Sequence, residues 1–286
     1  MNNSGCEKDK KAGKIKYLLF AAGFSILIFT AICLWNKKAD IKSNPASMMG
    51  TMVKKHLRHG TSEKQVPLKD VPEDFQAGDY EPNSKNDKHA VPDGTKTAYL
   101  SFDDGPSANN TPRILDILDN YKIKATFFLI GQHAQANKDL VEREWSSGDM
   151  VYNHTYDHNV DFIYKDPKNL VEDLNECDTI LKSLLPGYDK KVCRFPGGSK
   201  NRPAVFKAAV AKAGYRYVDW NCLTRDAEVP NLSIDQQLGY IKQFSKNKKD
   251  LIVLMHDDSG ETTTPDALPR IIDYLKSCGY AFKTIN

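Results

Sequence analysis

Short apolar segments alternate with longer amphipathic segments from residue 97 to the end of the chain. The apolar segments predict strands over residues 97–102, 125–130, 149–153, 191–195, 215–220, 250–256 and 280–284. Apolar residues recur at helical spacing over 111–121, 139–147, a long segment after Pro167, 204–213, 234–244 and 267–277. Nearly all-apolar strands that alternate with helices are typical of a parallel sheet covered by helices. The pattern predicts an α/β domain of about seven parallel strands, most naturally a (β/α) barrel, with an open doubly wound sheet as the alternative.

An uncharged segment over residues 17–35 precedes this domain. It is about long enough to cross a bilayer as a helix, and five lysines lie in the sixteen residues before it. A cleaved signal peptide is the alternative, but the apolar run is longer than a usual signal sequence and no A-x-A site follows it. We therefore predict a single-pass membrane anchor, with residues 1–16 in the cytoplasm and the rest of the chain outside.

Residues 36–90 are polar and show no sustained apolar period, which predicts an extracellular linker rather than a small extra domain. The folded part then spans residues 91–286. Four of the six cysteines fall within it: Cys177, Cys193, Cys222 and Cys278. They form no C-x-x-C pair, so no thiolate zinc site is indicated. Two disulfides and buried free thiols are equally compatible with their spacing.

Several functional classes have no support in the sequence. The net charge is +3, and no Lys/Arg-rich block occurs in the folded part, which argues against nucleic-acid binding. No glycine-rich phosphate-binding motif follows a predicted strand, which argues against nucleotide binding. Hydrophobic residues make up 40% of the chain, which is enough for a substantial core.

Polar residues gather where the predicted strands end. Asp103–Asp104 follow the first strand, the HTYDH segment 154–158 the third, and the RFPGGS segment 194–199 the fourth. Asp219–Trp220 end the fifth strand, and His256 ends the sixth. Each has an ordinary structural explanation on its own, such as a turn or a polar rim. In a (β/α) barrel, however, these ends meet at the face that carries catalysis, so together they predict an active site.

The residue types indicate metal-assisted hydrolysis. His154 and His158 are four residues apart and reach one ion if the segment coils. A carboxylate from a neighbouring strand completes a two-His, one-carboxylate site suited to Zn²⁺, although Co²⁺ or Ni²⁺ would fit too. Adjacent Asp103 and Asp104 point in different directions on an extended backbone, so one is expected on the metal and the other as a general base.

Five motifs resemble those of the polysaccharide deacetylase family (the NodB homology domain, carbohydrate esterase family 4). They are SFDDGP, HTYDH, RFPGGS, YVDW and LMH, in family order across about residues 95–286. The resemblance implies the family's distorted (β/α) barrel. The form of the third motif is most similar to that of membrane-bound peptidoglycan N-acetylglucosamine deacetylases.

Matched motif by motif, the resemblance implies that Asp103 is the catalytic base, that Arg194 orients it and that His256 is the general acid. It implies three ligands for one divalent metal ion: Asp104, His154 and His158. It places four further residues at the substrate or the oxyanion: Pro196, Gly197, Trp220 and Leu254. Gly197 would offer its backbone N–H to the oxyanion, and Leu254 would line the acetyl pocket.

One motif departs from the family pattern. Many members carry D-x-x-D-W, in which the first Asp supports the catalytic His. This chain does not carry that pattern intact around Trp220, and Leu223 and Asp226 come after the Trp. Support for His256 is therefore expected from Asp226 or from Asp219.

The activity implied is removal of N-acetyl groups from cell-wall polysaccharide, foremost from peptidoglycan N-acetylglucosamine. Chitin-like oligomers, N-acetylmuramic acid and O-acetylated glycans such as xylan are the alternatives. An inactive carbohydrate-binding module is disfavoured because the base and all three metal ligands are present. A two-carboxylate glycosidase is disfavoured because adjacent aspartates do not flank a sugar bond.

Overall fold

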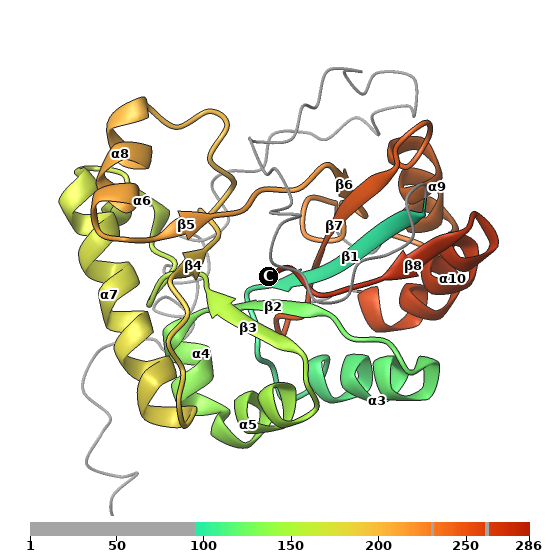
Figure 1. Ribbon diagram of the computed structural model, residues 1–286, viewed down its shortest axis with the longest axis horizontal. Helices are drawn as coiled ribbons and strands as arrows, with labels where there is room; N and C mark the ends of the chain where they lie inside the picture. Colours follow the sequence, from blue (N-terminus) through green and yellow to red (C-terminus); the bar gives the residue numbers. More distant parts are fainter. Residues whose placement is uncertain (1–94, 230–231, 261–262) are drawn as a thin grey trace, which may run out of the picture. The chain divides into compact units, whose positions relative to one another are not determined.

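The computed structural model describes residues 95–229, 232–260 and 263–286 (Figure 1). The predicted tail, anchor and linker lie outside these ranges. Within them, no helix combines the length and apolar character needed to span a membrane.

A parallel sheet forms the centre of the described part. Its strands are β1 (Lys96–Asp103), β2 (Thr126–Leu129), β3 (Met150–Asn153), β4 (Val192–Cys193), β5 (Arg216–Tyr217), β6 (Cys222–Leu223), β7 (Asp250–His256) and β8 (Tyr280–Phe282). Their order is β5-β4-β3-β2-β1-β7-β6, and β8 pairs with the first residues of β1. The sheet curls into a half-barrel, which is the distorted barrel expected. The barrel is not closed, because no pair joins β5 to β6 within the described ranges.

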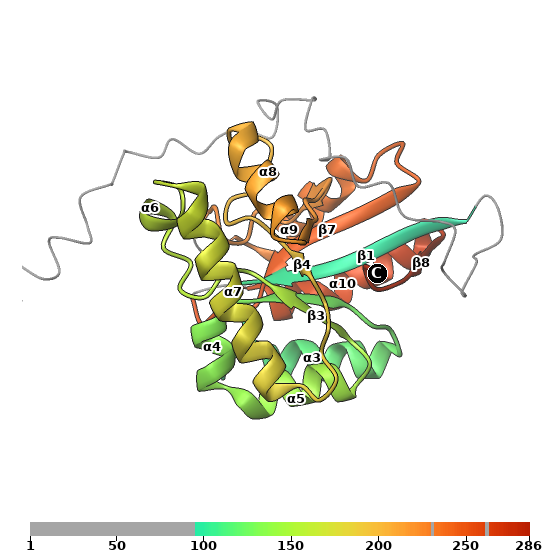
Figure 2. The same ribbon diagram turned by 60° about the vertical axis from the view of Figure 1, so that its left-hand side comes forward.

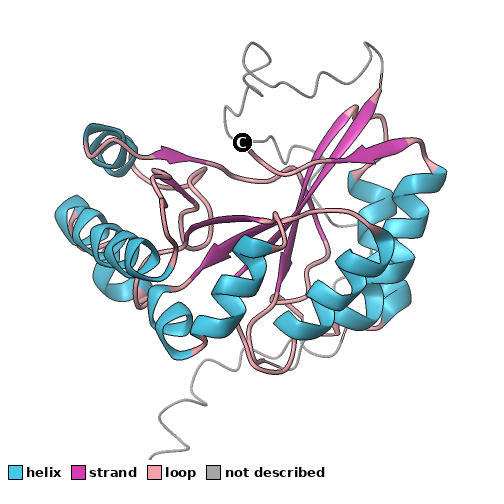
Figure 3. Cartoon of the chain, turned by 60° about the horizontal axis from the view of Figure 1, so that its bottom comes forward, coloured by secondary structure: helices cyan, strands magenta, loops and turns pink. Residues whose placement is uncertain are grey.

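Helices flank the curled sheet (Figures 1 and 2). They are α3 (Thr111–Tyr121), α4 (Gly131–Ala136), α5 (Lys138–Ser146), α6 (Val160–Ile163), α7 (Pro167–Leu184), α8 (Ala204–Lys212), α9 (Ile234–Phe244) and α10 (Thr264–Ser277). The longest helix, α7, is capped by Asp166, whose side chain accepts the N–H of Lys168. Its first residue is Pro167, which is favourable in a first turn. Figure 3 shows the strands lying between groups of helices.

Buried apolar residues hold these layers together. One cluster joins Leu170 and Leu174 of α7 to Phe206 of α8, and another joins Phe128 of β2 to Ile252 of β7. Burying one such side chain contributes about 1.5–3 kcal/mol.

The main differences from the predicted elements are local. The strand predicted over 215–220 is only β5, Arg216–Tyr217. A further short strand, β6, follows it and was not predicted. The short helices α4 and α6 were also not predicted, and α10 begins at Thr264 rather than 267. All four cysteines of the described ranges are free thiols, and all but Cys278 are buried.

Candidate active site

Asp103 is the last residue of β1, and strand register places it opposite His256 of β7. Its side chain is buried, and Arg194 Nη1 donates to its Oδ1 at 2.7 Å. The same nitrogen donates to Ser101 Oγ at 2.9 Å, and Arg194 Nε donates to Val218 O at 3.0 Å. The fully buried guanidinium of Arg194 therefore fixes Asp103 Oδ1 and does not bind Oδ2, which lies 3.7 Å from His154 Nε2.

Asp104 turns away from its neighbour, toward the two histidines. Its φ is +72°, the left-handed region that residues other than glycine rarely adopt. Asp104 Oδ1 lies 3.3 Å from His154 Nε2 and 3.5 Å from His158 Nε2. Asp104 Oδ1 thus faces both histidines, whereas Asp103 is held by Arg194 through Oδ1 and has its Oδ2 3.7 Å from His154 Nε2.

The three side chains fit a divalent metal ion. One ligand atom from each of Asp104, His154 and His158 lies within 4.8 Å of the others. His154 Nδ1 is hydrogen-bonded to Arg194 O at 2.9 Å, which leaves its Nε2 for the site. Asp104 Oδ1 is buried and has no hydrogen-bond partner in the described part of the chain. A buried oxygen without a donor, beside two imidazole nitrogens, is the arrangement a cation would satisfy.

The charges in this site shift the pKa values of its members. Burial alone would raise the pKa of Asp104, but the facing His154 and the nearby His256 and His158 hold it well below its usual value. Burial lowers the pKa of His158, and the neighbouring His154 lowers it further. The carboxylate therefore stays ionised, and His158 favours the neutral form that metal ligation requires.

His256 is held by a carboxylate from the neighbouring strand segment. Its Nδ1 lies 2.9 Å from Asp226 Oδ1, and its backbone N–H donates to Asp226 Oδ2 at 2.8 Å. Thr264 Oγ1 also donates to Asp226 Oδ2. Burial would lower the pKa of His256, but the bond to Asp226 and the charges of Asp226, Asp103 and Asp104 raise it to about 10. The imidazole therefore carries a proton at neutral pH, with Nε2 not engaged by Asp226.

Asp219, the other candidate support for His256, has a different role. Its carboxylate accepts the N–H of Ser199 at 3.0 Å and the hydroxyl of Ser199 at 2.6 Å. It therefore holds the loop after β4 in place. The structure resolves the alternative in favour of Asp226.

Comparison with known proteins decides the family. A family model described as polysaccharide deacetylase matches residues 90–218. A peptidoglycan-N-acetylglucosamine deacetylase of Bacillus cereus is 34% identical over 197 residues, which is 68% of this chain and 89% of that protein. The chain belongs to the polysaccharide deacetylase family. It is a hydrolase that acts on amide bonds, as the motifs implied.

Solved structures of the family share the fold. The catalytic domain of a peptidoglycan N-acetylglucosamine deacetylase from Eubacterium rectale is similar at a TM-score of 0.62 and 31% identity, covering 68% of this chain and 91% of that one. A Streptococcus mutans family 4 carbohydrate esterase is similar at a TM-score of 0.63 and 29% identity, covering 68% and 87%.

The other predicted site residues of this deacetylase lie at the ends of three strands. Pro196 and Gly197 follow β4, Trp220 follows β5, and Leu254 is near the end of β7. Pro196 O accepts from Tyr164 Oη at 2.8 Å and from Arg202 Nη2 at 3.0 Å, which fixes the loop after β4. Gly197, next in that loop, is exposed and has a φ of +70°. The Trp220 ring lies 5.7 Å from the Arg194 guanidinium, and Leu254 is buried on β7 two residues before His256.

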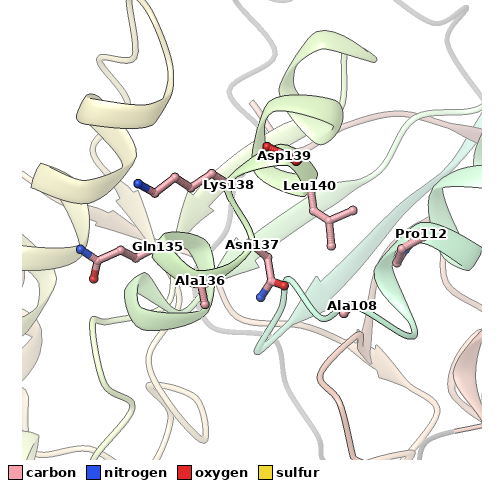
Figure 4. Close-up of a pocket in the computed structure, with 8 residues that line it drawn as sticks. All are labelled: Ala108, Pro112, Gln135, Ala136, Asn137, Lys138, Asp139 and Leu140. Atoms are coloured by element: carbon pink, nitrogen blue, oxygen red, sulfur yellow. The ribbon is translucent and has the colours of Figure 1, made fainter. Parts of the chain in front are cut away.

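A cavity of about 510 Å³ lies beside the loop after β1 (Figure 4). Its walls come from the loop after β1, the start of α3 and the α4–α5 junction: Ala108, Pro112, Gln135, Ala136, Asn137, Lys138, Asp139 and Leu140. Asn137 Nδ2 joins the walls by donating to Pro106 O at 3.1 Å. None of the lining residues belongs to the predicted site, so the cavity is a separate concave feature of the deacetylase.

Sequence reasoning missed several residues that support the site. Ser101 holds Arg194 from a position two residues before Asp103, and strand alternation puts both on one face. That polar residue within an apolar strand was an available signal. His133, whose Nδ1 lies 2.6 Å from Asp104 O, comes from the unpredicted helix α4 and gave no signal.

Proposed function

We propose that this deacetylase removes N-acetyl groups from peptidoglycan N-acetylglucosamine, using one divalent metal ion, Zn²⁺ in the native protein, held by Asp104, His154 and His158. The observation that carries the proposal is the different bonding of two adjacent carboxylates. Asp104 faces the histidine pair, and Asp103 is held by Arg194. The named activities of the Bacillus cereus and Eubacterium rectale relatives support the choice of sugar.

When bound, the metal would supply Lewis-acid polarisation of the acetyl carbonyl and of the attacking water. Asp103 accepts the proton of that water as general base, and Arg194 fixes the orientation of its carboxylate. Gly197 N–H donates to the developing oxyanion, an interaction of about 3 kcal/mol when one such donor is removed. His256, protonated by virtue of Asp226, gives its proton to the departing amine.

Mass spectrometry of peptidoglycan tests this assignment. Wall fragments incubated with the full-length chain should lose acetyl mass from N-acetylglucosamine. Chito-oligosaccharides and O-acetylated xylan serve as parallel substrates, because the Streptococcus mutans relative is named an esterase. Loss of acetyl groups from xylan alone would select the ester-hydrolase alternative, and loss from N-acetylmuramic acid would change the sugar.

The proposal also places the enzyme at the bacterial cell membrane. Residues 17–35 would anchor it, and residues 36–90 would let the catalytic part reach the wall. Its support is the pattern of apolar and charged residues in the sequence.

Metal removal is expected to abolish hydrolysis without unfolding the protein. The three proposed ligands lie in loops at the strand ends, whereas the buried apolar clusters lie elsewhere in the domain. Chelator treatment followed by activity assay and circular dichroism measures both effects. Full activity in metal-free protein would contradict the assignment of the ligands.

Asp226→Asn is expected to shift the basic limb of the pH–rate profile toward lower pH. The pKa of His256 is raised to about 10 by its pair with Asp226, so the protonated acid is lost only as pH rises through that value. An amide cannot stabilise the imidazolium as a carboxylate does, so the pKa should fall toward 6.5, the value of a free histidine. The matched control is Asp219→Asn, which should leave the basic limb in place. An unmoved limb in Asp226→Asn would assign it to another group.

A further inference from the structure

Asp257 is a buried acidic residue directly after His256, with no role in the mechanism above. Its side chain is 0% exposed. Its backbone N–H donates to Asp103 O at 3.1 Å, which extends the β1–β7 pairing one residue beyond the Asp103–His256 register. This hydrogen bond places Asp257 beside the turn that begins at Asp104.

The Asp257 carboxylate packs against that turn. A Cβ added at Gly105 would overlap its carboxylate atoms, so the side chain occupies the space that any larger residue at 105 would need. Thr111 Oγ1, in the first turn of α3, donates to Asp257 Oδ2 and so holds the carboxylate in place. The Asp104–Gly105 turn therefore rests directly on Asp257.

The rest of the loop is bonded to the same segment. Ser107 Oγ donates to Asp257 O at 2.5 Å, and Ser107 N donates to Thr111 Oγ1 at 2.8 Å. Asn110 Nδ2 donates to Asp258 O at 2.6 Å. The loop that carries Asp104 is thus tied to the end of β7 on both sides of the turn.

This packing coincides with two unfavourable features. Asp104 keeps a φ of +72°, which persists only where its surroundings impose it. Asp257 Oδ1 is buried and has no hydrogen-bond partner in the described part of the chain, which costs stability. Both features cost stability, and both lie at the contact between Asp257 and the turn.

We propose that Asp257 is a positioning residue for the metal site: packed under the Asp104–Gly105 turn, it holds Asp104 in the conformation that directs its carboxylate at His154 and His158. The inference rests on the proposed assignment of these three residues as metal ligands. In this role Asp257 does not bind the metal itself but orients Asp104, which does.

Co²⁺ titration of the full-length chain tests the inference, with Co²⁺ absorption bands as the report on coordination. Asp257→Ala should lower Co²⁺ affinity about 10- to 100-fold. Saturating Co²⁺ should restore part of the deacetylation rate, because the base and acid are intact. Asp257→Asn keeps both the volume and an acceptor for Thr111, so it should stay within about threefold of the parent. The matched control is Asp258→Ala, which removes the adjacent carboxylate, an acceptor for Gly260 N, and should leave affinity and rate unchanged.

Parental Co²⁺ affinity in a folded Asp257→Ala protein would overturn the inference, as would an equal loss in Asp257→Asn, which would implicate charge rather than packing. If Asp257→Ala does not fold, Thr111→Val carries the test, since it releases the carboxylate and the Ser107 N–H without changing a residue of the Asp104–Gly105 turn. Parental affinity in folded Thr111→Val would then overturn the inference. Failure of the proposed metal site is distinguishable, because the parent itself would not bind Co²⁺.

Discussion

Asp103→Asn is expected to lower the deacetylation rate about 10²–10⁴-fold while the protein still binds close to one equivalent of metal. An amide cannot accept the proton of the attacking water, so general-base catalysis is lost. The Asn side chain still offers an oxygen to Arg194 Nη1, which donates to the carboxylate at 2.7 Å in the parent. The fold and the three metal ligands should therefore be preserved.

Asp104→Asn is the matched comparison, since it makes the same chemical change one residue along. Here the altered group is the oxygen that faces both histidines, so metal affinity should fall and added metal should partly restore the rate. Metal content by elemental analysis and steady-state rates separate the two variants. Loss of metal from Asp103→Asn with retention in Asp104→Asn would reverse the roles proposed for the pair.

The fold was predictable from the sequence wherever a segment carried its own periodicity. The helix over 111–121 and the buried strand β7 were predicted with the bounds observed, because amphipathic spacing and apolar runs report local structure. The run from 215 to 223 shows the limit of this reasoning. The two strands of this segment, β5 and β6, are only a few residues apart in the sequence. In the sheet, however, β5 pairs with β4 and β6 pairs with β7, at opposite ends of the strand order. Strand pairing is non-local, and a single sequence does not encode it visibly.

The same pairing explains which part of the site could be predicted. The two proposed histidine ligands and the need for a carboxylate followed from residue types and from the shared edge of parallel strands, and the resemblance to the family chose Asp104. The support of His256 did not, because Asp219 and Asp226 were equally plausible in sequence. Since Leu223 of β6 pairs with Leu254 of β7, the loop after β6 brings Asp226 to His256. Asp219 follows β5 and so lies with the loop after β4.

Arg194→Met is expected to destabilise the folded protein by about 3–5 kcal/mol and to lower the rate at nearly parental metal content. Arg194 is fully buried, and its guanidinium lies 4.0 Å from the Phe128 ring centroid. Its removal leaves the Asp103 carboxylate buried without a cation, which costs more than the ion pair itself contributes. The reverse change is milder, because in Asp103→Asn the guanidinium keeps Ser101 Oγ and Val218 O as acceptors.

Denaturant unfolding of Arg194→Met, Asp103→Asn and the double variant measures this asymmetry. The double variant should be less destabilised than the sum of the single changes, because it no longer contains an unpaired buried charge. Arg202→Met is the matched control: Arg202 also stacks on a ring, 3.6 Å from the Tyr164 centroid, but it is only partly buried and pairs with a carbonyl. Its loss should cost about 1 kcal/mol or less, in the range of a single hydrogen bond. If Arg194→Met were no more destabilised than Arg202→Met, and additive with Asp103→Asn, the buried pair would not be what fixes the base in its orientation.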